Sequence, residues 1–333
     1  MSGSLLSICI PTFNGEEKLK KCLGKYLPDL ISNNIRVYIS DNASTDNTRS
    51  VIESYAKRYP NIHYHRNSTN VGVECNHEIV LKLSNTKYSW LMGDDDGLIG
   101  EELPSLLSAL KDTDYDFVIV NGGNYNDITK KVTKRIIIPD NIKIYGQCNE
   151  FIEELGWHII WMSCQIFNQK SISQLNYNKF RGSQIPQCLY ILDCISDSDK
   201  KILYWPKPII FHQILSGYRK DTFEIFAKNS YEYIMALSNN YKDSAKLKCI
   251  KDIARKPGVF SLKQLLIYRA QGYFDYSIYK KYKRYLPYVS RVNLIVIMLI
   301  SFLPCPRFVS RTFNFLFPWL YYLKRNLTFK KQL

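Results

Sequence analysis

Short apolar runs rich in β-branched residues recur along the first 120 residues at a nearly constant interval. The runs cover residues 6–10, 35–40, 62–65, 88–92 and 117–120, and their starts are separated by 29, 27, 26 and 29 residues. Such an interval accommodates one strand, one helix and their connections, so it predicts consecutive βα units. Right-handed crossovers between these units produce a mostly parallel sheet with helices on both faces. The spacing therefore predicts an α/β fold.

The segments between the runs have apolar residues at helical spacing. Helices are predicted over residues 16–27, 46–59, 73–83 and 101–110. The pattern loosens from residue 121 to residue 220, where residues 121–124 have the composition of a turn and residues 132–139 are compatible with a strand. A strand over residues 202–211 is interrupted by Pro206 and Pro208, which predicts a position at the edge of the sheet.

Charge is distributed unevenly along the chain. Among 333 residues, 45 are Lys or Arg and 30 are Asp or Glu, but residues 241–333 alone hold 19 bases and three acids. That segment carries a net charge of +16, and the other 240 residues carry −1. We therefore expect two parts, residues 1–220 and a basic helical region over residues 221–333. The basic region indicates an anionic partner, either lipid or nucleic acid.

Several classes of protein are excluded by composition. The chain is too apolar for a disordered protein, and nine scattered cysteines without a C-x-x-C pair indicate reduced thiols. The sequence contains no run of 18 apolar residues, so we expect no membrane span. The apolar run near the start is not preceded by a basic segment, so we expect no signal peptide. The apolar run at residues 292–303 suits an interfacial or buried helix. The glycine motifs of Rossmann and P-loop proteins are absent.

Polar loops follow four of the predicted strands. They are residues 11–14, 41–46, 93–96 and 121–123. In an open α/β sheet, ligands bind beyond the carboxyl ends of the strands, so these loops are expected to form a site along one edge.

Three adjacent carboxylates, Asp94, Asp95 and Asp96, stand in one of these loops. They repel one another unless a cation or fixed donors balance them, and hard oxygen ligands suit Mg²⁺ or Mn²⁺ bound to phosphate. A solvated acidic turn ahead of the next helix is the alternative. Asp41, at the end of the second strand, is suited to accept a bond from a ribose hydroxyl or a base N–H, or else forms an Asx turn.

Four motifs carry a resemblance to a known family. They are residues 7–14 (SICIPTFN), 39–48 (ISDNASTDNT), 70–72 (NVG) and 90–96 (WLMGDDD). Their order and spacing resemble those of family 2 glycosyltransferases with the GT-A fold. The Gly-Asp-Asp-Asp variant is similar to the bacterial O-antigen and capsule branch that includes abequosyltransferase-like enzymes. The resemblance covers residues 5–125.

The resemblance implies a set of site residues. Those for the donor nucleotide are Pro11, Thr12, Phe13, Asn14, Asp41, Asn70, Gly72, Asp94 and Asp95. Those for the metal are Asp95 and Asp96, with Asp94 as a substitute ligand because Gly93 takes the place of the family's first aspartate. His212, at the end of a predicted strand, is a further candidate for the metal or a phosphate, and a histidine satisfied within the core or at its rim is the alternative.

One departure from the family pattern concerns the catalytic base. Inverting members present an acidic pair about 90 residues after the metal motif, but the equivalent residues here, 182–187, contain no acid. Asp193 is the nearest carboxylate, within an apolar helical pattern that equally suits a helix-face acid. The sequence leaves the base unassigned.

Two functions from different classes follow. The first is a metal-assisted, inverting transfer of sugar from a nucleotide sugar to a lipid-linked or oligosaccharide acceptor in O-antigen or capsule synthesis. In it, the basic region would attach the enzyme to the cytoplasmic face of the bacterial membrane. The second is a basic protein that binds nucleic acid through its Lys- and Tyr-rich C-terminal region. The second leaves the acidic loops unexplained, so the first is favoured.

Overall fold

Ten strands in the described residues form one sheet. The structure is a computed structural model and describes residues 4–126, 131–134, 140–197, 200–212 and 221–303. The strands are β1 (Leu6–Thr12), β2 (Arg36–Asp41), β3 (Ile62–Arg66), β4 (Tyr88–Leu91), β5 (Asp96–Leu98), β6 (Phe117–Asn126), β7 (Lys131–Lys134), β8 (Lys143–Tyr145), β9 (Gln165–Asn168) and β10 (Ile202–His212).

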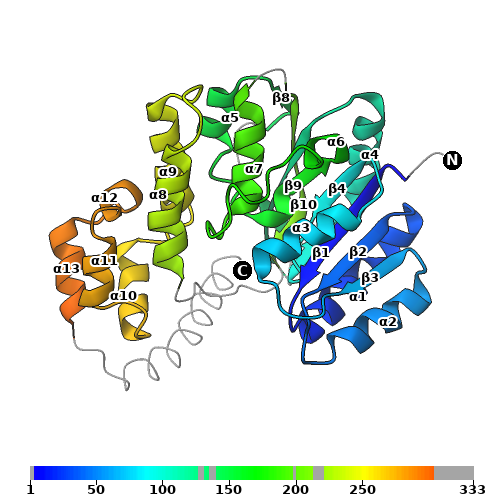
Figure 1. The fold of residues 1–333 in the computed structure, drawn as a ribbon, viewed down its shortest axis with the longest axis horizontal. Helices are drawn as coiled ribbons and strands as arrows, with labels where there is room; N and C mark the ends of the chain where they lie inside the picture. The colour runs from blue at the N-terminus through cyan, green and yellow to red at the C-terminus, as the bar shows by residue number, and fades with distance from the viewer. Residues whose placement is uncertain (1–3, 127–130, 135–139, 198–199, 213–220, 304–333) are drawn as a thin grey trace, which may run out of the picture. The chain divides into compact units, whose positions relative to one another are not determined.

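The sheet has the strand order β3-β2-β1-β4-β9-β6-β10-β5, with β7 paired to β6 and β8 paired to β10. Strands β1 to β4 are parallel neighbours, as the βα spacing predicts. Strand β9 lies antiparallel between β4 and β6, so the second half of the sheet is mixed. Figure 1 shows β1, β2 and β3 side by side at the blue end of the chain.

Helices cover both faces of this sheet because right-handed crossovers place α1 and α2 on one face and α3 on the other. The longer helices are α1 (Glu16–Ser32), α2 (Thr48–Arg58), α3 (Val73–Leu83), α4 (Leu103–Asp112), α7 (Pro186–Cys194), α9 (Asp243–Arg255), α10 (Leu262–Ala270) and α13 (Leu294–Phe302). The shorter ones are α5 (Cys148–Glu154), α6 (Gln169–Ile172), α8 (Ser230–Met235), α11 (Tyr276–Tyr282), α12 (Leu286–Val289), the 3₁₀ turns η1 (Gly100–Glu102), η2 (Met162–Cys164) and η3 (Ile195–Asp197), and the π-helix η4 (Glu224–Asn229).

Helix α1 shows how burial decides the length of an element. The sequence predicts an end at Leu27, before Pro28, but the helix continues to Ser32. Proline inside a helix costs about 3 kcal/mol, because it removes a backbone hydrogen bond. Leu30, beyond the proline, is fully buried, and a buried leucine contributes about 1.5–3 kcal/mol. Burial of that residue therefore offsets the cost of Pro28.

Two expectations for the second half of the sheet are wrong. Strand β10 is not at the edge, because it pairs with β6 on one side and with β8 and β5 on the other. Its prolines fall where the register with β6 shifts, so the missing N–H of Pro208 breaks no regular ladder. Residues 121–123 lie within β6, where Asn121 is buried and its side chain donates to the carbonyl of Pro206 at 3.0 Å.

The chain separates into two compact units. The first contains the described part of residues 1–217 together with residues 232–249, and it includes the whole sheet. The second contains the described part of residues 218–231 and 250–333. In this second unit Phe223 packs against four aromatic rings, those of Phe260, Tyr268, Phe274 and Tyr282. Within the described ranges, no helix combines the length and hydropathy that crossing a bilayer demands.

Candidate active site

The loops after β1 and β2 are tied together at the carboxyl edge of the sheet. Thr12 and Asp41, the last residues of these strands, are partners in the parallel register. Beyond them, the backbone N–H of Asn14 donates to Oγ of Ser44 at 2.9 Å. The N–H of Thr45 donates to Oδ1 of Asn14 at 2.8 Å. These reciprocal bonds fix the first loop against the second.

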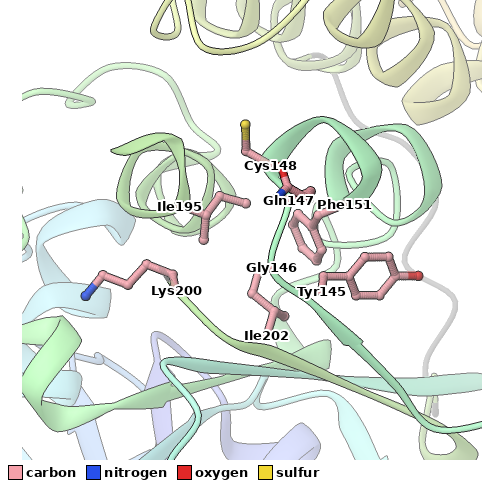
Figure 2. A pocket seen from close by; sticks show the side chains of 8 residues that line it. All are labelled: Tyr145, Gly146, Gln147, Cys148, Phe151, Ile195, Lys200 and Ile202. Carbon is pink, nitrogen blue, oxygen red and sulfur yellow. The ribbon is translucent and has the colours of Figure 1, made fainter. Parts of the chain in front are cut away.

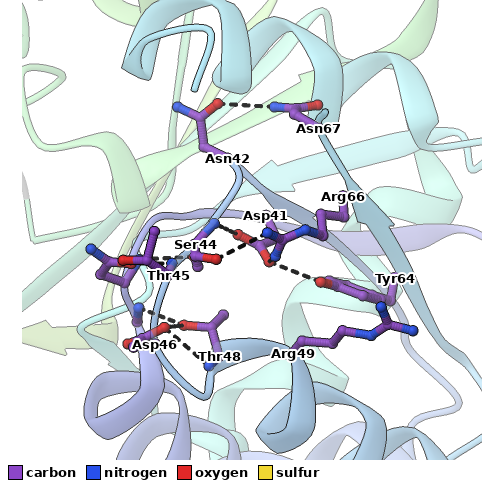
Figure 3. A network of polar contacts seen from close by, with 12 residues as sticks. Asp41, Asn42, Ser44, Thr45, Asp46, Thr48, Arg49, Tyr64, Arg66 and Asn67 are labelled. Atoms are coloured by element: carbon purple, nitrogen blue, oxygen red, sulfur yellow. Dashed lines mark hydrogen bonds and ion pairs between the residues drawn. The ribbon is translucent and has the colours of Figure 1, made fainter. Parts of the chain in front are cut away.

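Asp41 is fully buried and accepts a donor at both carboxylate oxygens (Figure 3). Its Oδ1 accepts the N–H of Ser44 at 2.8 Å. Its Oδ2 accepts the hydroxyl of Tyr64 at 2.8 Å and Nη1 of Arg66 at 3.2 Å, and Arg66 also donates to the carbonyl of Ser44 at 3.0 Å. A buried carboxylate requires such partners, because leaving it unpaired costs several kcal/mol.

The side chains of Tyr64 and Arg66, which contact Asp41, determine how a ligand could reach this carboxylate. Burial, and then the contact with Asp41, raise the pKa of Tyr64 to about 12, so its hydroxyl stays protonated and donates. The Arg66 side chain is 39% exposed and is the outermost of the partners. Any ligand would therefore contact Asp41 directly only after Arg66 moves aside.

We predict that Asp41→Asn lowers the free energy of unfolding by about 1–3 kcal/mol. The amide removes the charge that Arg66 pairs with and turns an N–H₂ group toward donors. Urea unfolding measures the loss, and Asp112→Asn, at an exposed helical position, is the matched control. Equal stability of the two variants would contradict the role of Asp41 as the centre of this network.

A chain of asparagine side chains holds the segment that starts α3. Asn42 donates to Oδ1 of Asn70 at 2.8 Å, and Asn67 donates to Oδ1 of Asn42 and of Asn76 at 3.0 Å each. Oδ1 of Asn70 in turn accepts the N–H of Gly72 at 2.9 Å. Gly72 has a left-handed φ of 84° and open space around it, so this position requires glycine for its backbone conformation. Two predicted site residues, Asn70 and Gly72, are thereby fixed beside the loop after β2.

The first acidic residue of the loop after β4 is paired within the protein. Asp94 is mostly buried and accepts the hydroxyl of Thr12 at 2.7 Å. It also forms an ion pair with Nζ of Lys18 at 3.0 Å. Asp94 therefore connects the acidic loop to β1, and the ammonium group of Lys18 already balances its charge.

The third acidic residue is surrounded by donors from two other segments. Oδ2 of Asp96 accepts Nε1 of Trp161 at 2.8 Å and the hydroxyl of Ser163 at 2.5 Å. Oδ1 of Asp96 lies 2.9 Å from Nδ1 of His212. The rings of Trp161 and His212 stack with centroids 4.0 Å apart. Trp161 is thus both a packed aromatic residue and a hydrogen-bond partner of the acidic loop.

Asp95 is the carboxylate for which no described side chain supplies a hydrogen bond or ion pair. Burial raises its pKa to about 6, and the charges of Asp96 and Asp94 add to the shift. The carboxylates of Asp95 and Asp96 both lie close to Gly93. If Gly93 had a Cβ atom, that atom would lie 3.0 Å from Oδ1 of Asp95 and 3.2 Å from Oδ2 of Asp96. Among the described side chains, the loop thus contains one carboxylate with no directly bonded donor or cation, although the charges of Lys18 and His212 lower its pKa from a greater distance.

We predict that Asp95→Asn makes the protein more stable at pH 7.5 in EDTA, by up to about 3 kcal/mol. The carboxyl pKa is about 6 in the folded chain and 3.8 in the unfolded chain, so its ionisation destabilises the fold as pH rises through that window. Denaturant unfolding at pH 7.5 and pH 3.5 measures the effect. The two proteins should be equally stable at pH 3.5, and a difference that persists there would contradict the electrostatic cause.

The acidic loop offers some of the ligands that a divalent cation needs. Asp95 and Asp96 provide hard oxygens, and His212 provides a nitrogen next to Asp96. In the described ranges, no group of three or more His, Cys, Asp or Glu side chains has the arrangement of a metal centre. The residues fit an Mg²⁺ or Mn²⁺ ion only if phosphate oxygens of a substrate complete its shell.

The other predicted residues have different surroundings. Pro11 and Thr12 are buried at the end of β1, whereas Phe13 is 44% exposed and offers a ring face for stacking. Asp193 lies near the carboxyl end of α7 and pairs with Lys179 at 2.5 Å. Six residues separate it from Gln187 at the start of α7, a distance of about 9 Å along the axis.

A pocket in the first unit lies apart from these residues (Figure 2). It encloses essentially no volume that a water molecule could occupy, so it cannot hold a small-molecule ligand as it stands. It is lined by Tyr145, Gly146, Gln147, Cys148, Phe151, Ile195, Lys200 and Ile202. None of the predicted site residues lines this pocket, so it is not part of the candidate site.

Several residues of the site were missed by sequence reasoning. Arg66 is the last residue of β3 and Asn67 follows it, so the rule that polar residues at the end of a strand mark the site would have identified them. Lys18 and Ser163 had no comparable signal, because they reach Asp94 and Asp96 from positions 76 and 67 residues away. Contacts of that separation depend on the completed fold.

The candidate site lies at the carboxyl edge of an open α/β sheet, which is where proteins of this fold class generally bind their ligands. The model of one family, glycosyl transferase family 2, matches residues 7–175, about half of the chain. The chain therefore belongs to this family and is a transferase. The predicted family resemblance and GT-A type fold are thereby confirmed.

Known proteins resemble parts of the chain. Over 108 residues it is 38% identical to the abequosyltransferase RfbV of Salmonella typhimurium (strain LT2), a match that spans 32% of each chain. Among solved structures, TarS 1–349 of S. aureus in complex with UDP-GlcNAc has a TM-score of 0.56 and 14% identity over 89% of this chain and 88% of TarS 1–349. The mannosyltransferase PcManGT of Pyrobaculum calidifontis, with GDP-Man and Mn²⁺, has a TM-score of 0.51 and 12% identity over 90% and 87%. The likeness to these two solved structures, at 14% and 12% identity, shows the fold alone.

Proposed function

We propose that this chain transfers a sugar from a nucleotide-sugar donor to a lipid-linked or oligosaccharide acceptor in the synthesis of bacterial O-antigen or capsule. The observation that carries the proposal is the acidic loop after β4, joined to the buried Asp41 network through the neighbouring ends of β1 and β2. Similarity to an abequosyltransferase supports the assignment to surface polysaccharide. The UDP-GlcNAc bound to TarS supports a nucleotide-sugar donor.

The donor nucleotide would lie along the carboxyl ends of β1 and β2. The exposed ring of Phe13 would stack on the base, and Asp41 would accept a base N–H once Arg66 moves aside. Asn70 and Gly72 would line the ribose and diphosphate, since the asparagine chain already fixes them there. Asp94 would act through Lys18, whose ammonium group attracts phosphate oxygens.

Asp95 and Asp96, with His212 next to Asp96, would hold a divalent cation only together with the donor diphosphate, whose oxygens would complete its shell. Such a cation neutralises the charge that develops on the leaving diphosphate. The unbalanced charge of Asp95 supports this role, and the Mn²⁺ in PcManGT supports the kind of metal. The acceptor hydroxyl would attack the anomeric carbon opposite the diphosphate, so the anomeric configuration inverts. A base removes its proton, and that residue stays unassigned, with Asp193 the candidate from the sequence.

We predict that Asp95→Asn lowers transfer by about 100- to 1,000-fold while the protein stays folded. Its expected gain in stability means that unfolding cannot explain the loss. Purified protein is assayed with a panel of nucleotide sugars in Mn²⁺, in Mg²⁺ and in EDTA, with Asp112→Asn as the control. Full activity in EDTA would refute the metal, and full activity of Asp95→Asn would refute its role.

The second unit carries the features of a membrane-binding surface. Three residues on one face of α13, Ile295, Leu299 and Phe302, are 58–63% exposed. Phe302 stacks on the exposed Tyr276 of α11 with centroids 4.5 Å apart, and α10 and α11 both pack against α13 (Figure 1). The described part of this unit has eleven Lys or Arg and four acids. We propose that this surface binds the anionic cytoplasmic face of the bacterial membrane.

We predict that the full-length protein co-sediments with vesicles that contain anionic lipid, and that binding weakens as salt rises. Replacing Ile295 and Leu299 by Glu should remove most of the binding at low salt, because it places two charges on the apolar face. Ile142→Glu, at an exposed apolar residue of the first unit, should have no effect.

Two results would count against this surface. Equal binding to neutral and anionic vesicles would refute the electrostatic contribution, and absence of binding to either would refute the proposal. Retention on DNA without metal-dependent binding of any nucleotide sugar would instead favour the nucleic-acid-binding function.

A further inference from the structure

The turn formed by residues 181–184 receives a carboxylate from a distant helix. Gly182 and Gln184 both have left-handed backbone conformations, with φ of 84° and 62°. Their N–H groups donate to the two carboxylate oxygens of Glu74, at 2.8 Å for Gly182 and 2.7 Å for Gln184. Backbone N–H groups that converge in this way form an anion-binding concavity. Glu74, in the first turn of α3, fills that concavity.

A second contact reinforces the first. Nη2 of Arg181 donates to Oε2 of Glu78 at 2.6 Å, and Nη1 of Arg181 contacts Sγ of Cys75. Glu74 and Glu78 lie one helical turn apart on the same side of α3. The first two turns of α3 therefore contact the 181–184 turn in two ways. Glu78 pairs with the Arg181 side chain, and Glu74 accepts the backbone N–H groups of Gly182 and Gln184.

The backbone of this turn needs outside support. Gln184 is not glycine, and a left-handed conformation is unfavourable for a residue with a Cβ. Such conformations persist where the surroundings enforce them. Ser183 between the two bonded residues is fully buried, and Pro186 two residues further on begins α7. The contact with Glu74 thus supports the backbone directly ahead of α7.

The same helix is fixed to the nucleotide side of the site. Asn76 accepts bonds from Ser40 at 2.7 Å and from Asn67 at 3.0 Å, and it donates to the carbonyl of Ser40 at 2.9 Å. Helix α3 begins directly after Asn70 and Gly72. One short stretch of α3 therefore connects the ends of β2 and β3 to the 181–184 turn.

We infer that Glu74 is a positioning residue for sugar transfer, holding the 181–184 turn in register with the residues proposed to bind the donor. The inference rests on the proposed function. Three residues of the turn, 182–184, belong to the stretch at residues 182–187 that has no acid of its own, and Glu74 brings a carboxylate to it from another element. A displacement of about 1 Å at a distance from the chemistry can lower a rate about 100-fold, because the reacting groups lose their alignment.

The test uses Glu74→Gln in the full-length protein. The amide has one acceptor oxygen, so it satisfies one of the two N–H groups and turns its own N–H₂ toward the other. We expect kcat for transfer to fall about 10- to 100-fold, with the donor KM changed less than about twofold. The ratio of donor hydrolysis to transfer should rise, because water replaces a misaligned acceptor. Glu74→Asp, which keeps the charge, should regain part of the transfer rate.

Glu53→Gln is the matched control, because Glu53 forms an exposed ion pair with Arg49 on α2 at 2.7 Å. Amide hydrogen exchange supplies a readout that needs no activity. Exchange at Gly182 and Gln184 should become faster in Glu74→Gln and stay unchanged in Glu53→Gln. Unchanged exchange, or unchanged kcat and hydrolysis ratio, would overturn the inference. If the wild-type protein transferred no sugar from any donor, the proposed function would fail, and exchange would still decide whether Glu74 holds the turn.

Discussion

The site depends on the parallel pairing of β1 with β2 on one side and with β4 on the other. In this register Thr12 is opposite Asp41, and Cys9 is opposite Leu91, so the three strands end at the same edge. Parallel pairing therefore brings together loops that lie about 30 and 80 residues apart in the sequence. The hydroxyl of Thr12 completes the arrangement by donating to Asp94 across 82 residues. The Thr12 side chain, at the end of β1, thus links the acidic loop to β1, and Asp41 lies opposite Thr12 on the neighbouring strand β2.

The three carboxylates of the acidic loop differ in how their charge is balanced. Asp94 pairs with a lysine, and Asp96 accepts neutral donors from Trp161 and Ser163 with His212 beside it. Asp95 has neither, and its raised pKa reflects burial beside two like charges. A fold selected for stability alone would replace such a group, since an unbalanced buried charge is costly. Its two neighbours are both anchored, Asp94 to Thr12 and Lys18 and Asp96 to Trp161 and Ser163, so the backbone on either side of Asp95 is held in place.

The sequence predicts the first half of the fold well, because local patterns determine it. The strands β1 to β4 and the helix α3 lie where the βα spacing puts them, and Asp41 and the acidic loop follow from the strand ends. The second half depends on pairing between distant segments. Residues 121–123 have the composition of a turn, yet backbone pairing with β10 extends β6 through them. The prolines of β10 indicate an edge strand, yet register shifts accommodate them in the interior of the sheet. In both places long-range pairing overrides local preference.

The partners of the predicted site residues were hidden for the same reason, and α3 shows how such partners arise. Glu74 and Asn76 are two residues apart, so their side chains leave the helix about 200° apart. One reaches the 181–184 turn, and the other reaches Ser40 and Asn67. The sequence of α3 alone reads as an ordinary amphipathic helix with a glutamate in its first turn. Its role as a connector emerges only when both neighbours are folded against it, because neither contact leaves a pattern in the helix itself. The ends of β2 and β3 and the turn ahead of α7 are then held by opposite sides of one helix, so any shift of α3 moves both together.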